Sequence, residues 1–378
     1  MTNPAKVSII VTSYNYSSYL RNAIDSALMQ TYPHIEVIVV DDGSTDHSAE
    51  IILGYNEKII PVLKQNGGQA SAFNAGFIKC SGDIILFLDS DDVLHPSAVE
   101  KIIPLFQGST VAKVHWILNE INGAGKATGK VTPSLQLSDG DLRDEVFRIG
   151  PSASGGPPHS PPTSGNAWSR MFLSQVLPIP EAEYITCTDQ YLQTLAPVYG
   201  RIRAIEQELG SYRIHGNNYS LNPLEKYMNE FLTRFESSCR LLHQHLLRQG
   251  IESDPSVWLR DSWFHRINKS LQEILVIVPE GGSFILVDAN DWGVPERYHG
   301  RRRLQFIDQQ GAYWGPPETD EHAIAEVKQG QQSGVQFIFF TWTTFWYLDY
   351  YADMTGYLRS YTTLVIKNER LIGFNLLN

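Results

Sequence analysis

The N-terminal part of the chain alternates short, β-branched apolar runs with a stretch of helical periodicity. Residues 7–11 are almost continuously apolar, which suits a strand that is buried on both faces. Leu20, Ile24 and Leu28 then recur at helical spacing, and Pro33 closes that helix. A strand, a helix and a further strand in this order predict parallel strands joined by right-handed crossovers.

Two further buried strands are expected at residues 36–40 and 83–88, with a weaker one at residues 59–63. In open sheets of parallel strands, ligands bind outside the carboxyl ends of the strands. Clusters of acidic residues follow directly after the strands at 36–40 and 83–88. The sequence therefore predicts an α/β fold with a site at this edge of the sheet.

Composition and charge exclude several classes of protein. The chain has 378 residues, 42% hydrophobic and 19% charged, which indicates a folded protein of two or three domains. Its net charge of -11 argues against nonspecific binding to nucleic acid, and we interpret the basic run at residues 301–303 as a solvated loop. The cysteines, Cys80, Cys187 and Cys239, lie far apart and form neither a zinc motif nor a disulfide framework.

The sequence also bears on the cellular location. It shows no charged-then-apolar signal at the N-terminus, and no apolar run reaches the ~18–20 residues that span a bilayer. We therefore expect a cytoplasmic protein with no transmembrane segment. Peripheral attachment at the membrane, where an embedded acceptor is within reach, is compatible with this expectation.

The first acidic cluster is Asp41-Asp42-Gly43-Ser44, which follows the second strand. At least one of its carboxylates can stand at the carboxyl edge of the sheet and accept a hydrogen bond from a uracil imide or a ribose hydroxyl. The alternative is a plain turn or helix cap, because Asp, Gly and Ser are the residues that turns favour.

The second acidic cluster is Asp89-Ser90-Asp91-Asp92, which follows the next strand. Three carboxylates within four residues repel one another unless a cation offsets their charge. Oxygen ligands of this kind suit Mg²⁺ or Mn²⁺, which can also neutralise a departing diphosphate. A capped acidic turn with no metal remains the alternative.

Four segments, in this order and spacing, resemble family-2 inverting glycosyltransferases. They are residues 7–15, the turn at 40–46, residues 66–76 and the tetrad at 89–92. The resemblance implies a GT-A fold, which is Rossmann-like with a mostly parallel sheet flanked by helices, and in-line displacement with inversion. It implies that Thr12, Tyr14 and Asp42 hold the uridine, that Asn74 lines the donor pocket, and that Asp89 and Asp91 lie at the ribose and the metal. The full set of implied donor-binding residues is Thr12, Tyr14, Asp42, Gly68, Asn74, Asp89, Ser90 and Asp91.

The acceptor side is marked by two segments. Residues 162–167 look like the acceptor-side segment of the family, and they include Gly165 and Asn166. Thr188 and Asp189 occupy the place where family members carry an acidic pair or a single Asp as base, so Asp189 is the catalytic base that the resemblance implies. We expect Asp189 in the first turn of a helix, where the helix dipole keeps the carboxylate ionised and lowers its basicity. The alternative is a helix-terminal acid with no chemistry.

Residues 212–218 resemble a segment that closes over the donor. An imidazole can complete a metal site begun by carboxylates, so we take Asp91 and His215 as the candidate metal ligands. His215 as a plain turn residue remains the alternative. The guanidinium of Arg213 is well shaped to meet a phosphate group.

The remaining pattern suggests how the chain is divided. The stretch from 150 to 165 is rich in Pro, Gly and Ser and is expected to be an acceptor-side loop. Helical periodicity over 224–250 and 258–275 predicts a helical connector. The expected domains are a GT-A domain at 1–220, with a donor half at 1–105 and an acceptor half at 106–220, then the connector at 221–276 and a small accessory α/β domain at 277–378.

In the C-terminal domain we expect strands at 284–287 and 337–340, a helix capped by Asp320, and a hairpin of 362–366 with 371–374 around Asn368. Its many aromatic residues favour a packed core over exposed rings that stack on sugars. A second catalytic domain, such as a methyltransferase, would need a glycine-rich cofactor loop, which the segment lacks. We treat it as accessory, for acceptor binding or self-association.

The function that these observations favour is transfer of a sugar from a nucleotide-sugar, with UDP-sugar preferred, to a hydroxyl of a saccharide or lipid-linked acceptor. Mn²⁺ or Mg²⁺ is the expected cofactor, and bacterial cell-surface polysaccharide or glycan synthesis is the expected setting. Two alternatives stay open. One is a weakly catalytic carbohydrate-binding or scaffolding protein, and the other is a bifunctional enzyme with a second transferase activity in residues 277–378. A homo-oligomer is compatible with each.

Overall fold

The computed structural model describes residues 4–107, 110–151, 159–216, 218, 224–306, 308–309, 312–313 and 315–377. The chain forms two compact units. Unit 1 comprises Met1–Leu221 and Thr233–Leu259, and unit 2 comprises Asn222–Leu232 and Arg260–Asn378. The helix α8 (Leu224–Arg248) therefore contributes residues to both units.

Unit 1 begins with four parallel strands, as the apolar runs predict. In sheet order these are β3 (Ile60–Leu63), β2 (Ile35–Asp41), β1 (Val7–Ser13) and β4 (Ile84–Asp89). Thr12 on β1 is in register with Val40 on β2 and with Asp89 on β4. The acids that end β2 and β4 thus share one edge of the sheet, as expected for parallel strands.

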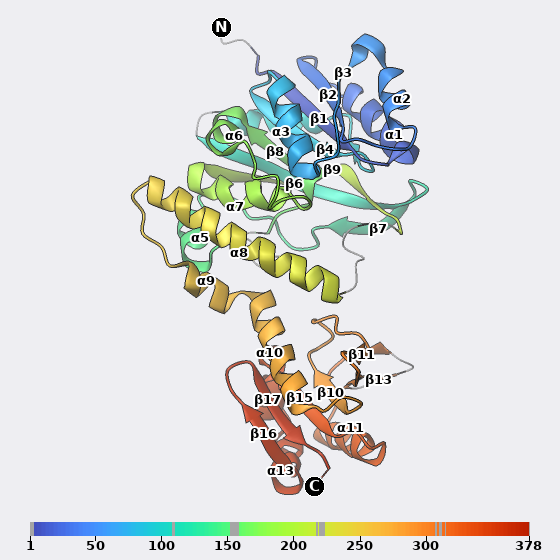
Figure 1. Ribbon diagram of the computed structural model, residues 1–378, viewed down its shortest axis with the longest axis vertical. Coiled ribbons are helices and arrows are strands. Elements are labelled where there is room, and N and C mark those ends of the chain that lie inside the picture. The colour runs from blue at the N-terminus through green and yellow to red at the C-terminus, as the bar shows by residue number, and fades with distance from the viewer. Residues whose placement is uncertain are drawn as a thin grey trace. The chain divides into compact units, whose positions relative to one another are not determined.

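Helices cover both faces of these strands (Figure 1). The helices α1 (Ser17–Leu28) and α2 (Ser48–Leu53) pack on the face that carries Val7, Ile9 and Val11. The helix α3 (Gln69–Lys79) lies on the other face, so close that a Cβ on Gly76 would collide with the Ile10 side chain. Each strand is therefore buried on two sides, which explains its continuous apolar sequence.

The second half of unit 1 contains strands that the sequence pattern did not predict. The long strands β6 (Val111–Asn122) and β9 (Arg201–Ile214) run parallel to each other, and β8 (Asn166–Ser169) joins β4 to β6 with antiparallel pairing. The order of the sheet is β3-β2-β1-β4-β8-β6-β9-β5, and β7 pairs with β6. The other elements here are β5 (Val93–Leu94), α4 (Ala98–Ile102), β7 (Ala127–Thr132), α5 (Arg143–Ile149), α6 (Arg170–Val176) and α7 (Asp189–Tyr199).

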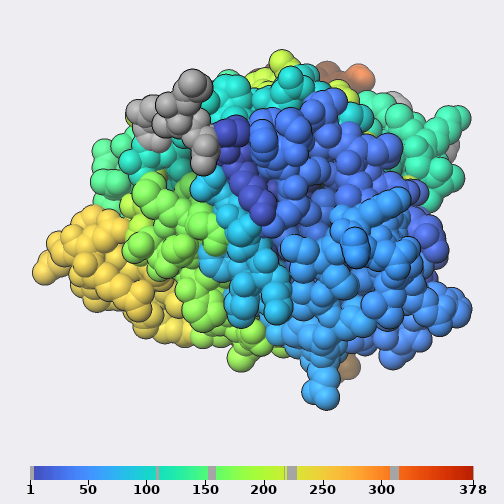
Figure 2. All heavy atoms as spheres, turned by 90° about the horizontal axis from the view of Figure 1, so that it is seen from above, coloured from blue at the N-terminus to red at the C-terminus, as the bar shows by residue number. Residues whose placement is uncertain are grey.

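Figure 2 shows the N-terminal quarter of the chain, in blue, as one contiguous surface that borders the green surface of the segment carrying α6 and α7. Of the expected acceptor-side loop, residues 152–158 lie outside the described residues. The part after them runs directly into β8.

The helical stretches differ from the prediction in one respect. The helix predicted at 258–275 is broken into α9 (Pro255–Asp261) and α10 (Trp263–Ile277). The break occurs because the Ser262 side chain accepts a hydrogen bond from the N–H of His265 and so caps a new helix. Within the ranges given above, no helix is both long and apolar enough to cross a bilayer.

Unit 2 is built on a smaller sheet of mixed direction. Its order is β11 (Arg297–Tyr298), β12 (Arg301–Gln305), β10 (Ser283–Val287), β15 (Phe337–Thr341), β17 (Leu371–Asn375) and β16 (Thr363–Lys367). The three strands β12, β10 and β15 are parallel, and the others are antiparallel. A separate pair joins β13 (Asp308–Gln309) to β14 (Ala312–Tyr313), and the helices are α11 (Asp320–Gln332), α12 (Trp346–Tyr350) and α13 (Ala352–Tyr361).

The core of unit 2 contains the buried rings of Phe306, Phe340, Tyr347 and Tyr351, so most of its aromatic density is packing, as expected. The basic run at 301–303 is not a solvated loop. It forms β12, and Arg301 donates to the carbonyls of Val278 and Leu275, at 2.9 and 3.0 Å.

The predicted cap at Asp320 is also wrong. The Thr319 side chain caps α11, because it accepts from the N–H of His322. The Asp320 carboxylate instead accepts from the N–H groups of Asp353 and Met354 at the start of α13, at 3.0 and 2.7 Å. The hairpin of β16 and β17 forms as predicted.

Candidate active site

The carboxylate of Asp42 organises the turn that follows β3. It accepts hydrogen bonds from Lys64 Nζ at 2.6 Å and from the Gly68 N–H at 2.7 Å, with Asn66 and Gly67 adding longer ones. Asp42 is only 3% exposed. A hydrogen bond from Asp42 to uridine would therefore be additional to bonds that already hold this turn.

Gly68 and Gln69 join the start of α3 to the segment before α7. Gly68 has a φ of +87°, and a Cβ there would lie 2.9 Å from the Ile185 carbonyl oxygen. The Gln69 side chain donates to Asp89 Oδ1 at 3.2 Å and accepts from the Thr188 N–H at 3.0 Å. One amide thus connects the acid at the end of β4 to the first turn of α7, a role for Gln69 that no sequence pattern indicated.

The acids after β4 form a crowded, buried group. Burial, and then the charges of Asp91 and Asp189, raise the pKa of Asp89 to about 8. Burial, and then the charges of Asp91 and Asp89, raise the pKa of Asp92 well above its usual range. Asp92 Oδ1 accepts from the Arg213 N–H at 2.9 Å, while its Oδ2 has no hydrogen-bond partner among the described residues. The structure therefore brings Asp89 and Asp189, a hundred positions apart, into one electrostatic site.

His215 lies against Asp91, the other candidate metal ligand. Its Nε2 is 2.9 Å from Asp91 Oδ2, and both side chains are largely buried. The imidazole stacks on Tyr19 with ring centroids 5.3 Å apart and meets Tyr16 edge-on at 5.6 Å. These two rings, on α1 and just before it, fix the plane of the imidazole, and no sequence pattern indicated a role for them.

Arg213 does not point to a phosphate position. Its side chain is 2% exposed and donates from Nε to the carbonyl of Asp91 at 2.7 Å. Its Nη1 reaches the carbonyls of Asn122 and Gly123, and the guanidinium lies 4.7 Å from the centre of the Tyr19 ring. Arg213 is therefore a structural residue that supports Asp91 and Tyr19, contrary to the expectation of a phosphate contact.

A divalent cation fits this group of side chains in part. The ligand atoms of Asp91 and His215 stand 2.9 Å apart, close to the separation of neighbouring ligands on an ion bound at about 2.1 Å. The raised pKa values of Asp89 and Asp92 mean that their ionised forms are disfavoured here, and a bound cation would favour those forms. No group of three or more His, Cys, Asp or Glu side chains within the described ranges is arranged to hold a metal by itself. A bound cation would need further ligands from substrate or water.

Asp189 begins α7, as predicted, but its acidity differs from the prediction. The helix-terminal position does lower its pKa, through the N–H of Gln190, and Lys113 and Arg234 also lower it. Burial outweighs them all, so the pKa of Asp189 is raised above its ordinary value, and the carboxylate is a stronger base than the dipole alone would give. Thr188 is fully buried, and its hydroxyl donates to the Tyr184 carbonyl at 3.0 Å.

Asn74 and Asn166 hold loops. The Asn74 amide donates to the Ile179 carbonyl at 3.0 Å and accepts from the Ile179 N–H at 2.8 Å. Asn166 is completely buried and donates to the carbonyl of Pro162 at 2.7 Å. These bonds give both amides a structural part, and a contact of Asn74 with the donor or of Asn166 with the acceptor stays a prediction.

The other expected site residues lie around this edge with varied exposure. Thr12 is 8% and Ser90 4% exposed, whereas Tyr14 is 47% exposed just after β1. A Cβ on Gly165 would come within 2.6 Å of Pro161, which explains a glycine before β8. Tyr14 is thus the accessible one of the three side chains.

Comparison with known proteins identifies the family. Residues 8–146 match the sequence profile of Glycosyl transferase family 2. A protein of Nostoc described as an uncharacterized glycosyltransferase is 34% identical over 283 residues, covering 68% of this chain and 86% of the relative. This chain belongs to glycosyltransferase family 2. It is therefore a glycosyltransferase, and the predicted α/β architecture with a second, C-terminal sheet is confirmed.

Other relatives of this family-2 chain match over shorter lengths. Chondroitin synthase of Pasteurella multocida is 41% identical over 123 residues, which is 32% of this chain and 13% of that protein. The chain spans only 30% of an uncharacterized glycosyltransferase of Rickettsia prowazekii. Among solved structures, TarS of S. aureus in complex with UDP-GlcNAc has a TM-score of 0.49 and 18% identity, and covers 68% of this chain and 71% of that one.

Proposed function

We propose that this family-2 glycosyltransferase moves a sugar from a UDP-sugar to a hydroxyl of a saccharide or lipid-linked acceptor, with inversion at the anomeric carbon. The observation that carries the proposal is the meeting of Asp89 and Asp189 in one electrostatic site, where Gln69 joins Asp89 to the backbone of Thr188 next to Asp189. Each role in such a reaction then falls to a group at this edge of the sheet.

The donor would lie along the carboxyl ends of β1, β2 and β4. Thr12, Tyr14 and the turn held by Asp42 would contact the uridine, with Gly68, Asp89 and Ser90 around the ribose. Asp91 and His215 would hold Mn²⁺ or Mg²⁺, which supplies neutralising charge to the diphosphate when it is bound. Tyr16 and Tyr19 would hold the imidazole in the plane that this ligation needs.

Asp189 would act as the base. The proton of the acceptor hydroxyl passes to an Asp189 carboxylate oxygen, the hydroxyl oxygen bonds to the anomeric carbon, and the bond to the diphosphate oxygen breaks on the opposite face. The burial that raises the pKa of Asp189 supports this role, because a base is most effective when its pKa lies closer to the working pH. Gln193 donates to Asp189 Oδ2 at 3.2 Å and orients the carboxylate.

We further propose that unit 2 is accessory, for acceptor binding or self-association, and that the enzyme works in bacterial cell-surface polysaccharide or glycan synthesis. A cytoplasmic protein that attaches to the membrane surface fits an acceptor of that kind. The packed aromatic core of unit 2 supports an accessory role, because its buried rings stabilise the unit and are not available to bind a second substrate.

The proposal is tested by a thermal-shift panel of UDP-glucose, UDP-galactose, UDP-GlcNAc, GDP-mannose and dTDP-glucose, each with and without Mn²⁺. A ligand that binds only the folded state raises the melting temperature according to its occupancy. We expect a Mn²⁺-dependent rise with at least one UDP-sugar. Asp91→Asn should lose the Mn²⁺-dependent part, whereas Asp288→Asn, which changes a buried acid in unit 2, should keep it.

The same panel, read together with the release of UDP, separates the alternative functions. A rise with UDP-sugars but no release of UDP in the presence of any acceptor would favour a carbohydrate-binding or scaffolding protein on this fold. A larger rise with GDP-mannose would move the donor to another nucleotide. The absence of any Mn²⁺-dependent rise would overturn the assignment of Asp91 and His215.

A further inference from the structure

The strand β6 carries a charged side chain into the interior of unit 1. Lys113 is 3% exposed and lies in a run of mostly apolar residues. Its Nζ donates to the Ser160 hydroxyl and stands 5.3 Å from the centre of the Trp168 ring. Trp168 is the cross-strand partner of Lys113 on β8, so the sheet register itself sets this contact. A lysine buried so completely is unfavourable unless a nearby group offsets its charge.

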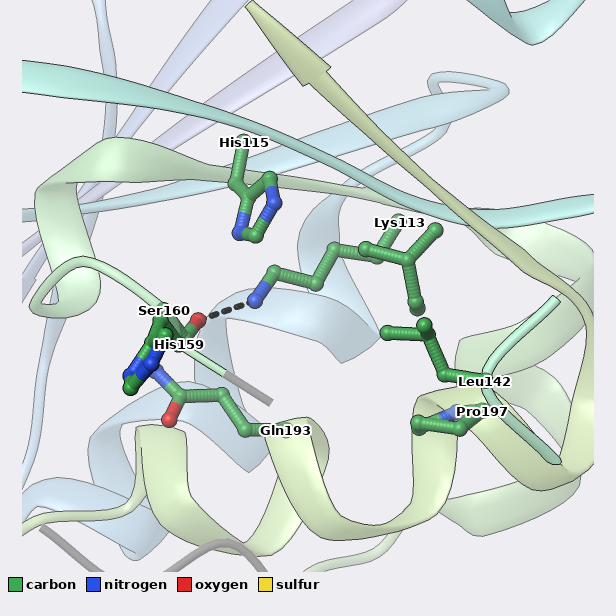
Figure 3. Close-up of a pocket in the computed structure, with 8 residues that line it drawn as sticks. Lys113, His115, Leu142, His159, Ser160, Gln193 and Pro197 are labelled. Atoms are coloured by element: carbon green, nitrogen blue, oxygen red, sulfur yellow. Dashed lines mark hydrogen bonds between the residues drawn. The ribbon is translucent and has the colours of Figure 1, made fainter. Parts of the chain in front are cut away.

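The Lys113 ammonium opens onto a small cavity next to α7. Figure 3 shows the side chain reaching between His115 and Gln193 toward Ser160. The cavity is lined by Lys113, His115, Leu142, His159, Ser160, Gln193, Pro197 and Ile202.

Gln193 belongs to this cavity and to the active site at once. Its Nε2 donates to the Pro161 carbonyl at 3.0 Å and to Asp189 Oδ2 at 3.2 Å. Since Gln193 lies one helical turn after Asp189 on α7, the two side chains share a face of that helix. The cavity of Lys113 therefore reaches the carboxylate of Asp189 through a single amide.

The charges of Lys113 and Asp189 shift each other's pKa. Burial lowers the pKa of Lys113 to about 7, and the charge of Asp189 opposes that fall. Burial raises the pKa of Asp189, and the charge of Lys113 opposes that rise. His115 adds no positive charge, because burial and Lys113 lower its pKa well below the usual range.

Other charged groups also face Asp189. Arg234 approaches from α8 and lowers the pKa of Asp189, but its Nε is engaged with Gln190 Oε1 at 3.0 Å. From β4, the acid Asp89 is close enough that its pKa responds to the charge of Asp189. The carboxylate of Asp189 is thus influenced both by an acid on β4 and by the buried ammonium on β6.

We propose that Lys113 is the buried counter-charge of Asp189 and a positioning residue for the transfer reaction. The inference rests on the proposed role of Asp189 as base. The ammonium keeps Asp189 ionised in a site where burial and the neighbouring acids favour its neutral form, and Ser160 and Gln193 fix where the two groups stand. The threonine at position 188 makes this more important, since Asp189 has no acidic neighbour in sequence to share the proton.

A double-mutant cycle tests the pairing without reference to activity. The melting temperature is measured for the wild type, Lys113→Met, Asp189→Asn and the double variant. Each single change leaves one buried charge without its partner, so we expect the double variant to be more stable than the sum of the single losses. Lys113→Arg keeps the positive charge. Asp189→Asn should therefore lower the melting temperature of Lys113→Arg by as much as it lowers that of the wild type. Additive losses would overturn the pairing.

The pH profile tests the positioning role. Release of UDP from UDP-GlcNAc is followed with Mn²⁺ between pH 5 and 9, using the wild type, Lys113→Met and Lys113→Arg. Loss of the ammonium should move the acidic limb of Lys113→Met upward by about one pH unit, while Lys113→Arg keeps it in place. An unmoved acidic limb would overturn the role of Lys113.

The two proposals fail in different ways. If Asp189→Asn turns over normally while the cycle still shows coupling, Asp189 is not the base and the buried pair stands. If Asp189→Asn is inactive and the cycle is additive, the base stands and Lys113 has no part in it. If Lys113→Met does not fold, Lys113→Gln, which also removes the charge but keeps a polar group beside Ser160, takes its place in the cycle, and additive losses would again overturn the pairing.

Discussion

Both units place an aspartate at the carboxyl end of a buried parallel strand, Asp89 on β4 and Asp288 after β10, but their surroundings differ. Asp288 accepts from the N–H of Asn290 at 3.1 Å and of Trp292 at 3.2 Å. Those bonds and the charge of Arg303 lower its pKa against the rise that burial causes. Asp89 accepts side-chain hydrogen bonds from Thr163 and, at 3.2 Å, from Gln69, but its neighbours are acids that raise its pKa further. Asp288 therefore holds a turn in unit 2, whereas Asp89 in unit 1 lies among acids that disfavour its ionised form.

The same contrast holds for buried cations. In unit 2, Arg370 is 9% exposed and pairs with Glu273 at 2.5 Å. In unit 1, Lys113 has a hydroxyl and an aromatic ring as its near contacts. The charge of Arg370 is balanced by a neighbouring carboxylate, whereas the charge of Lys113 is left to a more distant partner. A position at the end of a strand therefore does not identify a functional acid. A charge that the surrounding groups compensate only in part does identify one.

Among the tests of this contrast, we expect the largest effect, a loss of turnover, for a substitution of Asp189. Asp189→Asn removes the proposed base and should lower turnover by about 10²–10⁴-fold, because that is the usual contribution of general-base catalysis. The Mn²⁺-dependent thermal shift with the donor should persist, since Asp189 is not among the proposed donor ligands. Steady-state release of UDP, measured on the donor selected by the thermal-shift panel, checks this.

The matched control for Asp189 is Asp288→Asn. Asp288 is buried and has a raised pKa, as the active-site acids have. Its hydrogen bonds, however, are made with residues of its own turn. Its replacement should leave turnover unchanged within a factor of about two. Comparable losses in the two variants would show that burial, and not position in the site, governs the effect, and the contrast between the units would fail.

The sequence predicted the donor half of the fold well, for a local reason. The strands at 7–11, 36–40 and 83–88 are buried on both faces, so their apolar runs are unmistakable, and parallel topology then brings their acids to one edge. The long strands β6 and β9 were missed. They carry polar and charged residues such as Lys113 and Glu208, and they are strands because they pair with each other over a long register.

The site was predictable to a similar degree. Asp91 and His215, the two candidate metal ligands, lie next to each other, and Asp189 begins its helix as expected. The roles of Gln69, Tyr19 and Lys113 depend on contacts between segments far apart in sequence. One signal was present, because a lysine at position 113 interrupts an otherwise apolar run. Asn74 and Asn166 show the converse, since a family motif does not reveal whether a polar side chain faces a ligand or its own loop.

The next prediction compares two glycines with a left-handed backbone. Gly68 has a φ of +87° and faces the Ile185 carbonyl, while Gly293, in the turn after Asp288, has a φ of +63° and no described atom within 4 Å of the place where a Cβ would lie. Gly293→Ala should cost about 1 kcal/mol from backbone strain alone. Gly68→Ala adds a collision with backbone and should cost about 3 kcal/mol. Urea unfolding measures the free energy of unfolding of both variants. Equal losses would show that the backbone at Ile185 can move to make room for a Cβ at position 68.

A pH dependence of stability is expected from Lys113. Its folded pKa of about 7 lies below the ordinary value of 10.5, so the unfolded chain holds more protons than the folded protein between these values. Stability should therefore rise as the pH increases from 7 to 9, by up to about 2 kcal/mol, because the cost of the buried charge disappears. Urea unfolding of Lys113→Met should lack this rise. Parallel curves for the two proteins would show that Lys113 is already balanced, as Arg370 is.

The smallest effect is expected for the stability of Asp288→Asn. The amide keeps one oxygen to accept from the N–H of Asn290 or Trp292 and loses the other acceptor, so the free energy of unfolding should fall by about 1 kcal/mol. Asp89→Asn should behave in the opposite way without Mn²⁺ above pH 8, where Asp89 is ionised, because it removes a charge that Asp91 and Asp189 repel. A stabilised Asp89→Asn beside a destabilised Asp288→Asn would show that unit 1 carries strain that its ligands relieve, since stability and function compete where charge is left unbalanced.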